Sequence, residues 1–181
     1  MSIKQLNASY LVQEDRILFR INTAEKAEFC FLLTRRVAVF ILAASEHLVE
    51  KQLEQKHDPV TAKALADFEK KNLISSDAQG PEFESGETFP LGNTPLLVLD
   101  VTCGLTDSDS GGEQLFSIDF ILGKDQNINL KLPKPMLIAM RVLLENLCDQ
   151  ASWGRAMIAT SAPDSGGSVV IDVPGSSSTI H

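Results

Sequence analysis

Apolar residues recur at every second position near the start of the chain. Residues 16–22 place three bulky apolar side chains on one face, which is the period of a half-buried β-strand: Ile17, Phe19 and Ile21. Residues 27–33 form a second stretch rich in aromatic and aliphatic side chains, after a short polar turn. These two stretches predict a β-hairpin, and a weaker strand is expected before it, at about residues 3–12.

Two helices are predicted after this hairpin. Thr34 is a suitable N-cap, and residues 37–44 are apolar on every side, so the first half of this helix is predicted to be buried all round. Its second half is amphipathic and charged. Asp58 and Pro59 then provide a cap and a first-turn proline for a second helix that reaches about residue 73. The spacing predicts four residues on the inner side of this helix: Val60, Ala64, Leu65 and Phe68.

A second unit of the same kind begins near residue 95. Residues 95–104 predict a strand, and residues 115–122 and 127–132 predict a second hairpin. Pro133 and Pro135 end the last strand and begin a helix, whose apolar residues keep helical spacing to about residue 153.

The stretches outside these units differ in composition. Residues 75–93 combine Gly and Pro with acids and serines and are interpreted as a linker. Residues 161–181 are rich in Gly and Ser and predict a disordered tail, which leaves residues 1–160 as a single domain. One apolar segment of the tail, residues 168–173, could add a strand to an exposed sheet edge, but we interpret it as an inactive part of the tail.

The two units share a pattern at a spacing of 99 residues. At this shift the apolar positions of the first hairpin superpose on those of the second: Ile17, Phe19, Ile21, Phe29, Phe31 and Leu33 on Phe116, Ile118, Phe120, Ile128, Leu130 and Leu132. We therefore predict an α+β fold whose antiparallel sheet or sheets are built from two β-hairpin–helix units, residues 3–74 and 95–154. One extra helix follows the first unit, and a flexible C-terminal tail ends the chain. The shared pattern raises the hypothesis of an internal duplication, with the hairpins in one sheet or in two sheets that face each other across the helices.

The net charge of −8 narrows the choice of partners. An acidic chain has little general affinity for nucleic acid or anionic lipid. Cys30, Cys103 and Cys148 form no CxxC pair and are interpreted as reduced core thiols. The first residues lack the pattern of a signal peptide, and the longest apolar run is too short to span a bilayer. We expect a cytoplasmic protein that makes no membrane contact.

Basic residues stand at the starts of two predicted helices, where the helix dipole disfavours them. Arg35 and Arg36 follow the N-cap Thr34, and Lys134 has the matching place in the second unit. Guanidinium, ammonium and free N–H groups in such a place could bind an anion or the carboxylates of a partner. The simpler interpretation, which we prefer, is that these side chains are solvated or pair with acids of the preceding hairpin.

The sequence contains no motif that identifies a catalysed reaction. G-x-S-x-G, HxxxH, HExxH and a glycine-rich phosphate loop that begins a helix are all missing. Residues 107–113 have the composition of a calcium loop but lack an acid and the flanking helices of an EF-hand, so a solvated loop is the better interpretation. Cys103 could be a reactive thiol at a strand end, but a structural cysteine is favoured. We predict no metal, no cofactor and no catalytic residue.

The apolar helices indicate a class of function. Both the first and the last predicted helix have more apolar surface than one sheet face can cover, and such a surplus usually marks an interface. We therefore predict a non-catalytic binding or assembly protein, a homodimer or other homo-oligomer, which acts through contacts with a protein partner that the sequence does not identify. A small-ligand or enzymatic protein whose site assembles from scattered residues is a further alternative, which a ligand-induced thermal shift would reveal.

The passage from the last strand into the last helix, Leu132 and Pro133, and the repeated unit suggest a third class. Together they resemble the repeats of the PUR/Whirly/transcriptional-coactivator group of single-strand nucleic-acid binders. The resemblance covers the two units, concerns topology only, and implies bases stacked on aromatic side chains over a basic sheet. The aromatic content of 6% and the net charge of −8 count against this alternative.

Overall fold

The computed structural model describes residues 2–75, 82–108, 114–123 and 126–154. Its elements follow the predicted order closely: β1 (Ile3–Leu11), β2 (Arg16–Thr23), β3 (Glu28–Leu33), α1 (Arg35–Glu54), α2 (Pro59–Ser75), β4 (Leu96–Leu97), β5 (Asp100–Asp107), β6 (Gln114–Gly123), β7 (Gln126–Leu132) and α3 (Lys134–Gln150). The α+β fold, both hairpins and the extra helix after the first unit are thus confirmed. The tail, residues 161–181, and its segment 168–173 lie outside the described residues.

The strands form two sheets, in the orders β1-β2-β3-β4 and β5-β6-β7. The prediction of purely antiparallel sheets is wrong for the first sheet, because the short β4 pairs with β3 in parallel. The single strand expected at residues 95–104 in fact contributes to both sheets. The Val98 N–H donates to the Leu32 carbonyl in the first sheet, and the Leu99 N–H donates to the Ile121 carbonyl in the second. The run around this switch is continuously apolar, so no change of period marks it in the sequence.

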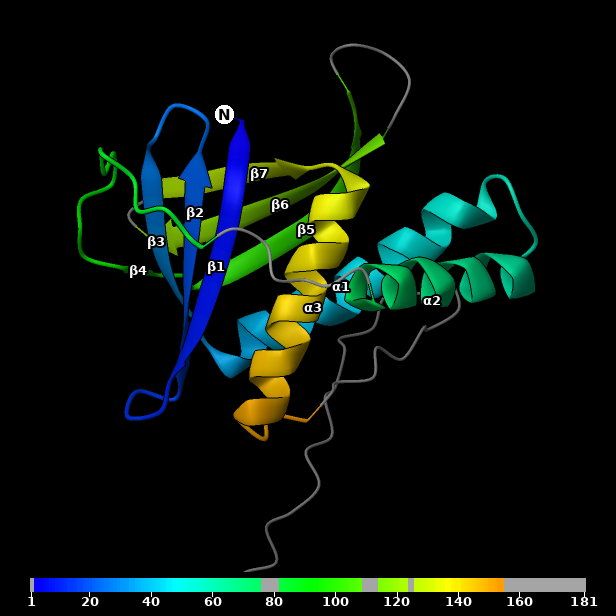
Figure 1. The fold of residues 1–181 in the computed structure, drawn as a ribbon, viewed down its shortest axis with the longest axis horizontal. Coiled ribbons are helices and arrows are strands. Elements are labelled where there is room, and N and C mark those ends of the chain that lie inside the picture. Colours follow the sequence, from blue (N-terminus) through cyan, green and yellow to red (C-terminus); the bar gives the residue numbers. More distant parts are fainter. Residues whose placement is uncertain (1, 76–81, 109–113, 124–125, 155–181) are drawn as a thin grey trace, which may run out of the picture.

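The two sheets pack directly against each other, with strands that cross at a steep angle (Figure 1). The ring of Phe120 meets the rings of Phe31 and Phe19 edge-on, with centroids 5.1 and 6.2 Å apart. The largest fully buried side chains come from both hairpins and from α1 and α3: Phe19, Phe31, Phe116, Phe120, Ile17, Ile21, Leu33, Ile41, Ile118, Leu130, Leu132 and Leu137. The alternating apolar positions recognised in the sequence therefore form the shared core of the two sheets.

α1 and α3 each pack against a strand of the other unit. α1 contacts β5, α3 contacts β1, and the two helices contact each other, while α2 lies against both. This arrangement buries most of the apolar positions of α1 and α3 within the chain, including Ile41 and Leu144, but leaves Phe40 of α1 44% exposed. The prediction that the first half of α1 is buried all round is therefore wrong at Phe40, and most of the surplus apolar surface inferred for these two helices is covered by the protein itself.

Trp153, the last buried residue described, closes the end of α3. Its indole N–H donates to Asp15 Oδ1 at 2.7 Å, and its ring meets Tyr10 edge-on at 5.7 Å. The Tyr10 hydroxyl donates to the same oxygen, and these two hydrogen bonds hold the pKa of Asp15 below its ordinary value. Trp153 thus fastens the end of α3 to the β1–β2 turn.

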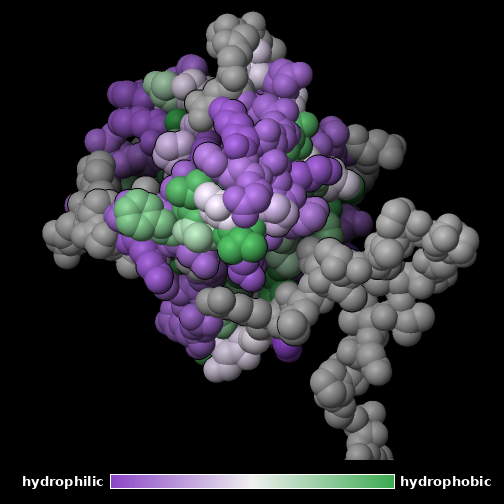
Figure 2. Space-filling model, turned by 90° about the vertical axis from the view of Figure 1, so that its right-hand side faces the viewer, coloured by the Kyte–Doolittle hydropathy of each residue, from purple (hydrophilic) through white to green (hydrophobic). Residues whose placement is uncertain are grey.

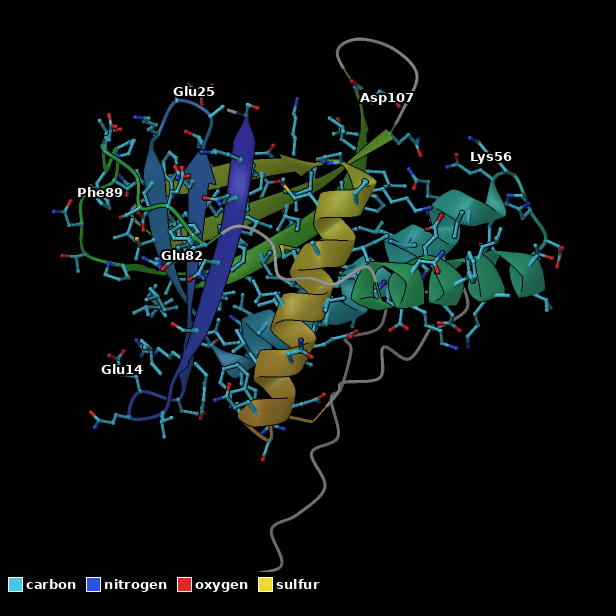
Figure 3. All side chains as sticks on the ribbon, viewed as in Figure 1. Glu14, Glu25, Lys56, Glu82, Phe89 and Asp107 are labelled. Carbon is cyan, nitrogen blue, oxygen red and sulfur yellow. The ribbon has the colours of Figure 1, made fainter. Side chains whose placement is uncertain are left out.

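Residues 82–93, which we call the strap, cross the outer face of the first sheet, where Glu82 and Phe89 mark the course of this segment (Figure 3). The strap was interpreted as part of a linker, but it is hydrogen-bonded to the sheet. Asn22 Nδ2 donates to the Glu84 carbonyl at 2.7 Å, and the Glu28 N–H donates to the Thr88 carbonyl at 2.8 Å. The strap therefore belongs to the folded domain.

The two hairpins have matching registers. Ile17 pairs with Leu33 and Phe19 with Phe31, and the residues 99 positions further along pair in the same way, Phe116 with Leu132 and Ile118 with Leu130. The helices also begin 99 residues apart, at Arg35 and Lys134.

No helix of the described ranges is long and apolar enough to cross a membrane.

Candidate protein-binding surface

Thr34 caps α1 as predicted. Its hydroxyl accepts a hydrogen bond from the Val37 N–H at 3.4 Å. Arg36 reaches back to the start of the second sheet, where it donates to Asp100 Oδ1 at 3.4 Å and to the Leu99 carbonyl. Both partners of this ion pair are exposed, so it adds little stability.

Lys134 pairs with an acid from another helix. Its ammonium lies 2.9 Å from Glu69 Oε1 and 2.7 Å from Glu69 Oε2, on α2, and its side chain is only 15% exposed. The pair links the start of α3 to α2. Lys134 therefore already has a carboxylate partner within the chain.

The basic residues proposed as an anion or partner site lie at two ends of α3. The positive charge of Arg35 favours the ionised forms of Asp15 and Cys148 and so acts to lower the pKa of both groups. Arg35 therefore lies near Cys148, in the last turn of α3. Lys134 is the first residue of the same helix, so about 20 Å of helix separates it from Cys148. The structure does not bring Arg35 and Lys134 together, and anion binding at either residue stays a prediction.

Glu28 forms a buried polar cluster beneath the strap. Its carboxylate accepts hydrogen bonds from the Ser85 hydroxyl at 2.7 Å and the Gly86 N–H at 2.8 Å, and Arg20 lies 3.6 Å away. Burial by itself would raise the pKa of Glu28, but the hydrogen bonds from Gly86, Ser85 and Cys30 and the charge of Arg20 hold it below the ordinary value of 4.5. Every partner is a neighbour on the sheet or the strap, which indicates a structural role.

Arg141 lies buried between α3 and α1. One of its terminal nitrogens is 3.9 Å from Glu145 of α3 and 3.9 Å from Glu46 of α1, and its Nε has no hydrogen-bond partner in the described part of the chain. These long distances make weak ion pairs. The cluster connects two helices, and Arg141 at its centre is only 6% exposed.

The three cysteines are free thiols, and none has the lowered pKa of a nucleophile. Burial raises the pKa of Cys30 to about 11, that of Cys103 to about 12 and that of Cys148 to about 11. The reactive-thiol alternative for Cys103 gains no support from these values. Within the described ranges, no three His, Cys, Asp or Glu side chains meet as potential metal ligands.

Among the helices that the structure describes, α2 has the most exposed large apolar side chains, on its outward face. Val60 is 80% exposed and Phe68 is 60% exposed. Ala64 between them is exposed as well, and the spacing of four residues places all three on one side of the helix. We call these three residues the α2 stripe. The α1–α2 hairpin extends beyond the two sheets (Figure 1), and its outer end has a small hydrophobic area surrounded by hydrophilic side chains (Figure 2).

The sequence prediction reversed the orientation of α2 for three of the four residues that it placed inside. Val60, Ala64 and Phe68 are exposed, and Leu65 is half-buried. The residues that face inward instead are Ala62, which is fully buried, and Glu69, which reaches Lys134. Two facts explain the reversal. Small alanines at positions 62 and 66 let α2 approach its neighbouring helices closely, and the Lys134–Glu69 ion pair requires the Glu69 side to face inward. A charged residue on the inner side of a helix gives no hydrophobic signal in the sequence.

A second group of apolar side chains, each less exposed than Val60 and Phe68, lies near Arg36. Phe40, one turn after Arg36 on α1, is 44% exposed, and Leu99 and Ile121 are 48% and 38% exposed. Leu99 and Ile121 are neighbours through the hydrogen bond that joins their backbones. Phe40 provides an exposed phenylalanine on another helix for comparison with Phe68.

No known protein family matches this sequence, and neither the curated proteins nor the solved structures include a match. The function must therefore be inferred from the surface of this chain.

Proposed function

We propose that this protein is a non-catalytic binding or assembly protein that acts through protein–protein contacts, with the α2 stripe as its contact surface. The proposal includes a cytoplasmic location. The three free cysteines agree with a reducing compartment.

The proposal rests on the exposure of Phe68 and Val60 in a molecule that buries most of its other large apolar residues. Leaving a phenylalanine and a valine in water on one helix face forgoes roughly 1.5–3 kcal/mol for each side chain that could otherwise be buried. Contact with a partner recovers this free energy. Aromatic side chains of this kind are enriched at protein interfaces.

The nucleic-acid alternative has less support from the surfaces of the two sheets. The strap crosses the outer face of the first sheet, where Phe83 stacks on the guanidinium of Arg20 at 4.3 Å from the ring centroid. On the outer face of the second sheet, Asn129 donates hydrogen bonds to Ser117 and Asp119 at 2.7 Å. The strap occupies the first face, and on the second face the outward residues described for β6 and β7 include no aromatic side chain, so both faces are poor platforms for stacked bases.

We further propose that the two units arose as an internal duplication. The equal spacing of 99 residues between hairpin registers and between helix starts supports this, as does the reciprocal packing of α1 on β5 and α3 on β1. The strap and α2 are then additions to the first unit. The contact surface therefore lies on a part of the chain that the second unit lacks.

Site-specific photo-crosslinking tests the function. A photoreactive phenylalanine analogue replaces Phe68 in one variant and Phe40 in the control, and each is irradiated in an extract of the cells that produce the protein. We expect covalent adducts of defined mass from position 68 in excess of those from position 40. Equal or absent adducts at the two positions would refute the α2 stripe as a contact surface.

A further inference from the structure

We propose that the α2 stripe binds a second copy of this chain, with the two α2 helices antiparallel about a twofold axis at Ala64. This inference rests on the proposed function and names its partner. The partner follows from the order of residues along the outward face of α2, which is self-complementary in shape and in charge.

The apolar residues are symmetric in position and complementary in size about Ala64. In an antiparallel pair centred there, Val60, four residues before the centre, lies level with Phe68 of the other copy, four residues after it. Each large aromatic ring therefore meets a smaller aliphatic side chain, twice. At the axis, Ala64 faces Ala64, and such small side chains allow two helices to approach to the short end of the usual range, about 8 Å.

Charged residues follow the same symmetry. Lys63 and Asp67 are exposed and lie on the same flank of the stripe, since a helix turns by about 100° for each residue. A twofold axis of this kind brings equal flanks together. Asp67 of one copy then lies within two residues, about 3 Å along the axis, of Lys63 of the other, and the pairing occurs twice. Lys63 and Asp67 form no ion pair with any residue of the described ranges, so both are free to make these contacts.

One helix face per copy is a small interface. Interfaces below about 1,200 Å² belong to weak or transient associations, so the dimer dissociates on dilution. The expected behaviour is a monomer–dimer equilibrium rather than an obligate dimer.

Light scattering of the full chain over about a hundredfold range of concentration tests the proposal. We expect the average mass to fall from dimer toward monomer on dilution, and Phe68→Ser to shift the equilibrium to monomer by at least about tenfold. Phe40→Ser, which replaces an exposed phenylalanine on α1, should leave the equilibrium unchanged. A monomer at every concentration overturns the proposal, and so does a dimer that Phe68→Ser leaves intact.

Charge exchange tests the antiparallel arrangement itself. Lys63→Glu and Asp67→Lys each place like charges opposite each other twice, so each variant alone should dimerise more weakly. Mixing the two variants should form a heterodimer. The carboxylate introduced at position 63 of one copy then faces the ammonium introduced at position 67 of the other, while the original Asp67 and Lys63 also pair. The double variant should recover the homodimer. Mixed variants that remain monomeric while the original chain dimerises overturn this arrangement.

The protein-binding function and the self-association can be refuted independently. If position 68 crosslinks to a different protein and the purified chain is monomeric, the protein-binding function is supported and self-association is refuted. An adduct with twice the mass of the chain supports both.

Discussion

Glu28 is a buried acid whose ionised form is stabilised by residues far away in the sequence. Its carboxylate is 2% exposed, and its shortest hydrogen bonds come from Ser85 and Gly86 of the strap. A buried carboxylate without such donors would be destabilising, so the strap and Glu28 stabilise each other. The sequence does not reveal this, because Glu28 and Ser85 are 57 positions apart and no pattern in the sequence pairs them.

Glu28→Gln should lower the free energy of unfolding by about 1–3 kcal/mol at neutral pH, because the amide keeps the shape but loses the charge-assisted hydrogen bonds. Urea unfolding followed by far-ultraviolet circular dichroism measures the change. Glu87→Gln is the control, since Glu87 lies on the same strap and its ion pair with Lys26 is exposed. Equal effects of the two substitutions would contradict the structural role assigned to Glu28.

The same carboxylate predicts a dependence on pH. The pKa of Glu28 is below 4.5 in the folded protein, so its contribution is complete above about pH 4.5 and is lost as the pH falls through the folded pKa. The difference in unfolding free energy between the original chain and Glu28→Gln should therefore shrink as the pH is lowered from neutral to about 3. A difference that stays constant over this range would show that folding does not lower the pKa of Glu28.

Gly86 allows the strap to lie against the sheet. A Cβ at this position would lie 2.6 Å from the Glu28 Cβ and 2.7 Å from its backbone nitrogen. Gly86→Ala should therefore lift the strap and cost about 1–3 kcal/mol. Hydrogen exchange should be faster at the Glu28 amide, which donates to Thr88. Gly104→Ala is the matched control because nothing lies within 4 Å of a Cβ there.

At the scale of elements, the periodicity of apolar residues predicts most of the strands and helices. It fails where a polar contact determines which side of a helix faces the core. The alternating positions of the hairpins and the cap at Thr34 locate β2, β3 and α1 within one or two residues. The inner side of α2 could not be predicted, because Glu69 faces inward to meet Lys134. The candidate site was missed for the same reason, since Phe68 was predicted to be buried.

The orientation of α2 can be tested through this ion pair. Glu69→Gln removes the carboxylate that pairs with the largely buried Lys134 ammonium and should lower the melting temperature by several degrees, for a loss of about 1–3 kcal/mol. Glu54→Gln, at the exposed end of α1, should have little effect. If both variants melt at the same temperature, the Lys134–Glu69 contact does not fix α2.

The whole molecule is held together by contacts between its two units. Phe120 of the second unit packs on Phe19 and Phe31 of the first, and α1 and α3 each cover a strand of the other unit. Neither unit therefore buries its core without the other. Under the proposed duplication, the two units correspond to the two identical chains of a symmetric dimer.

Separating the chain before residue 95 tests this interdependence. Residues 1–94 and 95–181, produced as two polypeptides, should each lack a cooperative thermal transition, because each exposes the apolar face that the other covers. An equimolar mixture should recover near-ultraviolet circular dichroism and a single transition. Phe120→Ala in the second polypeptide removes the ring between Phe19 and Phe31 and should weaken recovery by about 3–5 kcal/mol of association free energy. A cooperative transition in either polypeptide by itself would show that one unit holds a complete core, and the reciprocal packing of the helices would then be an accessory contact.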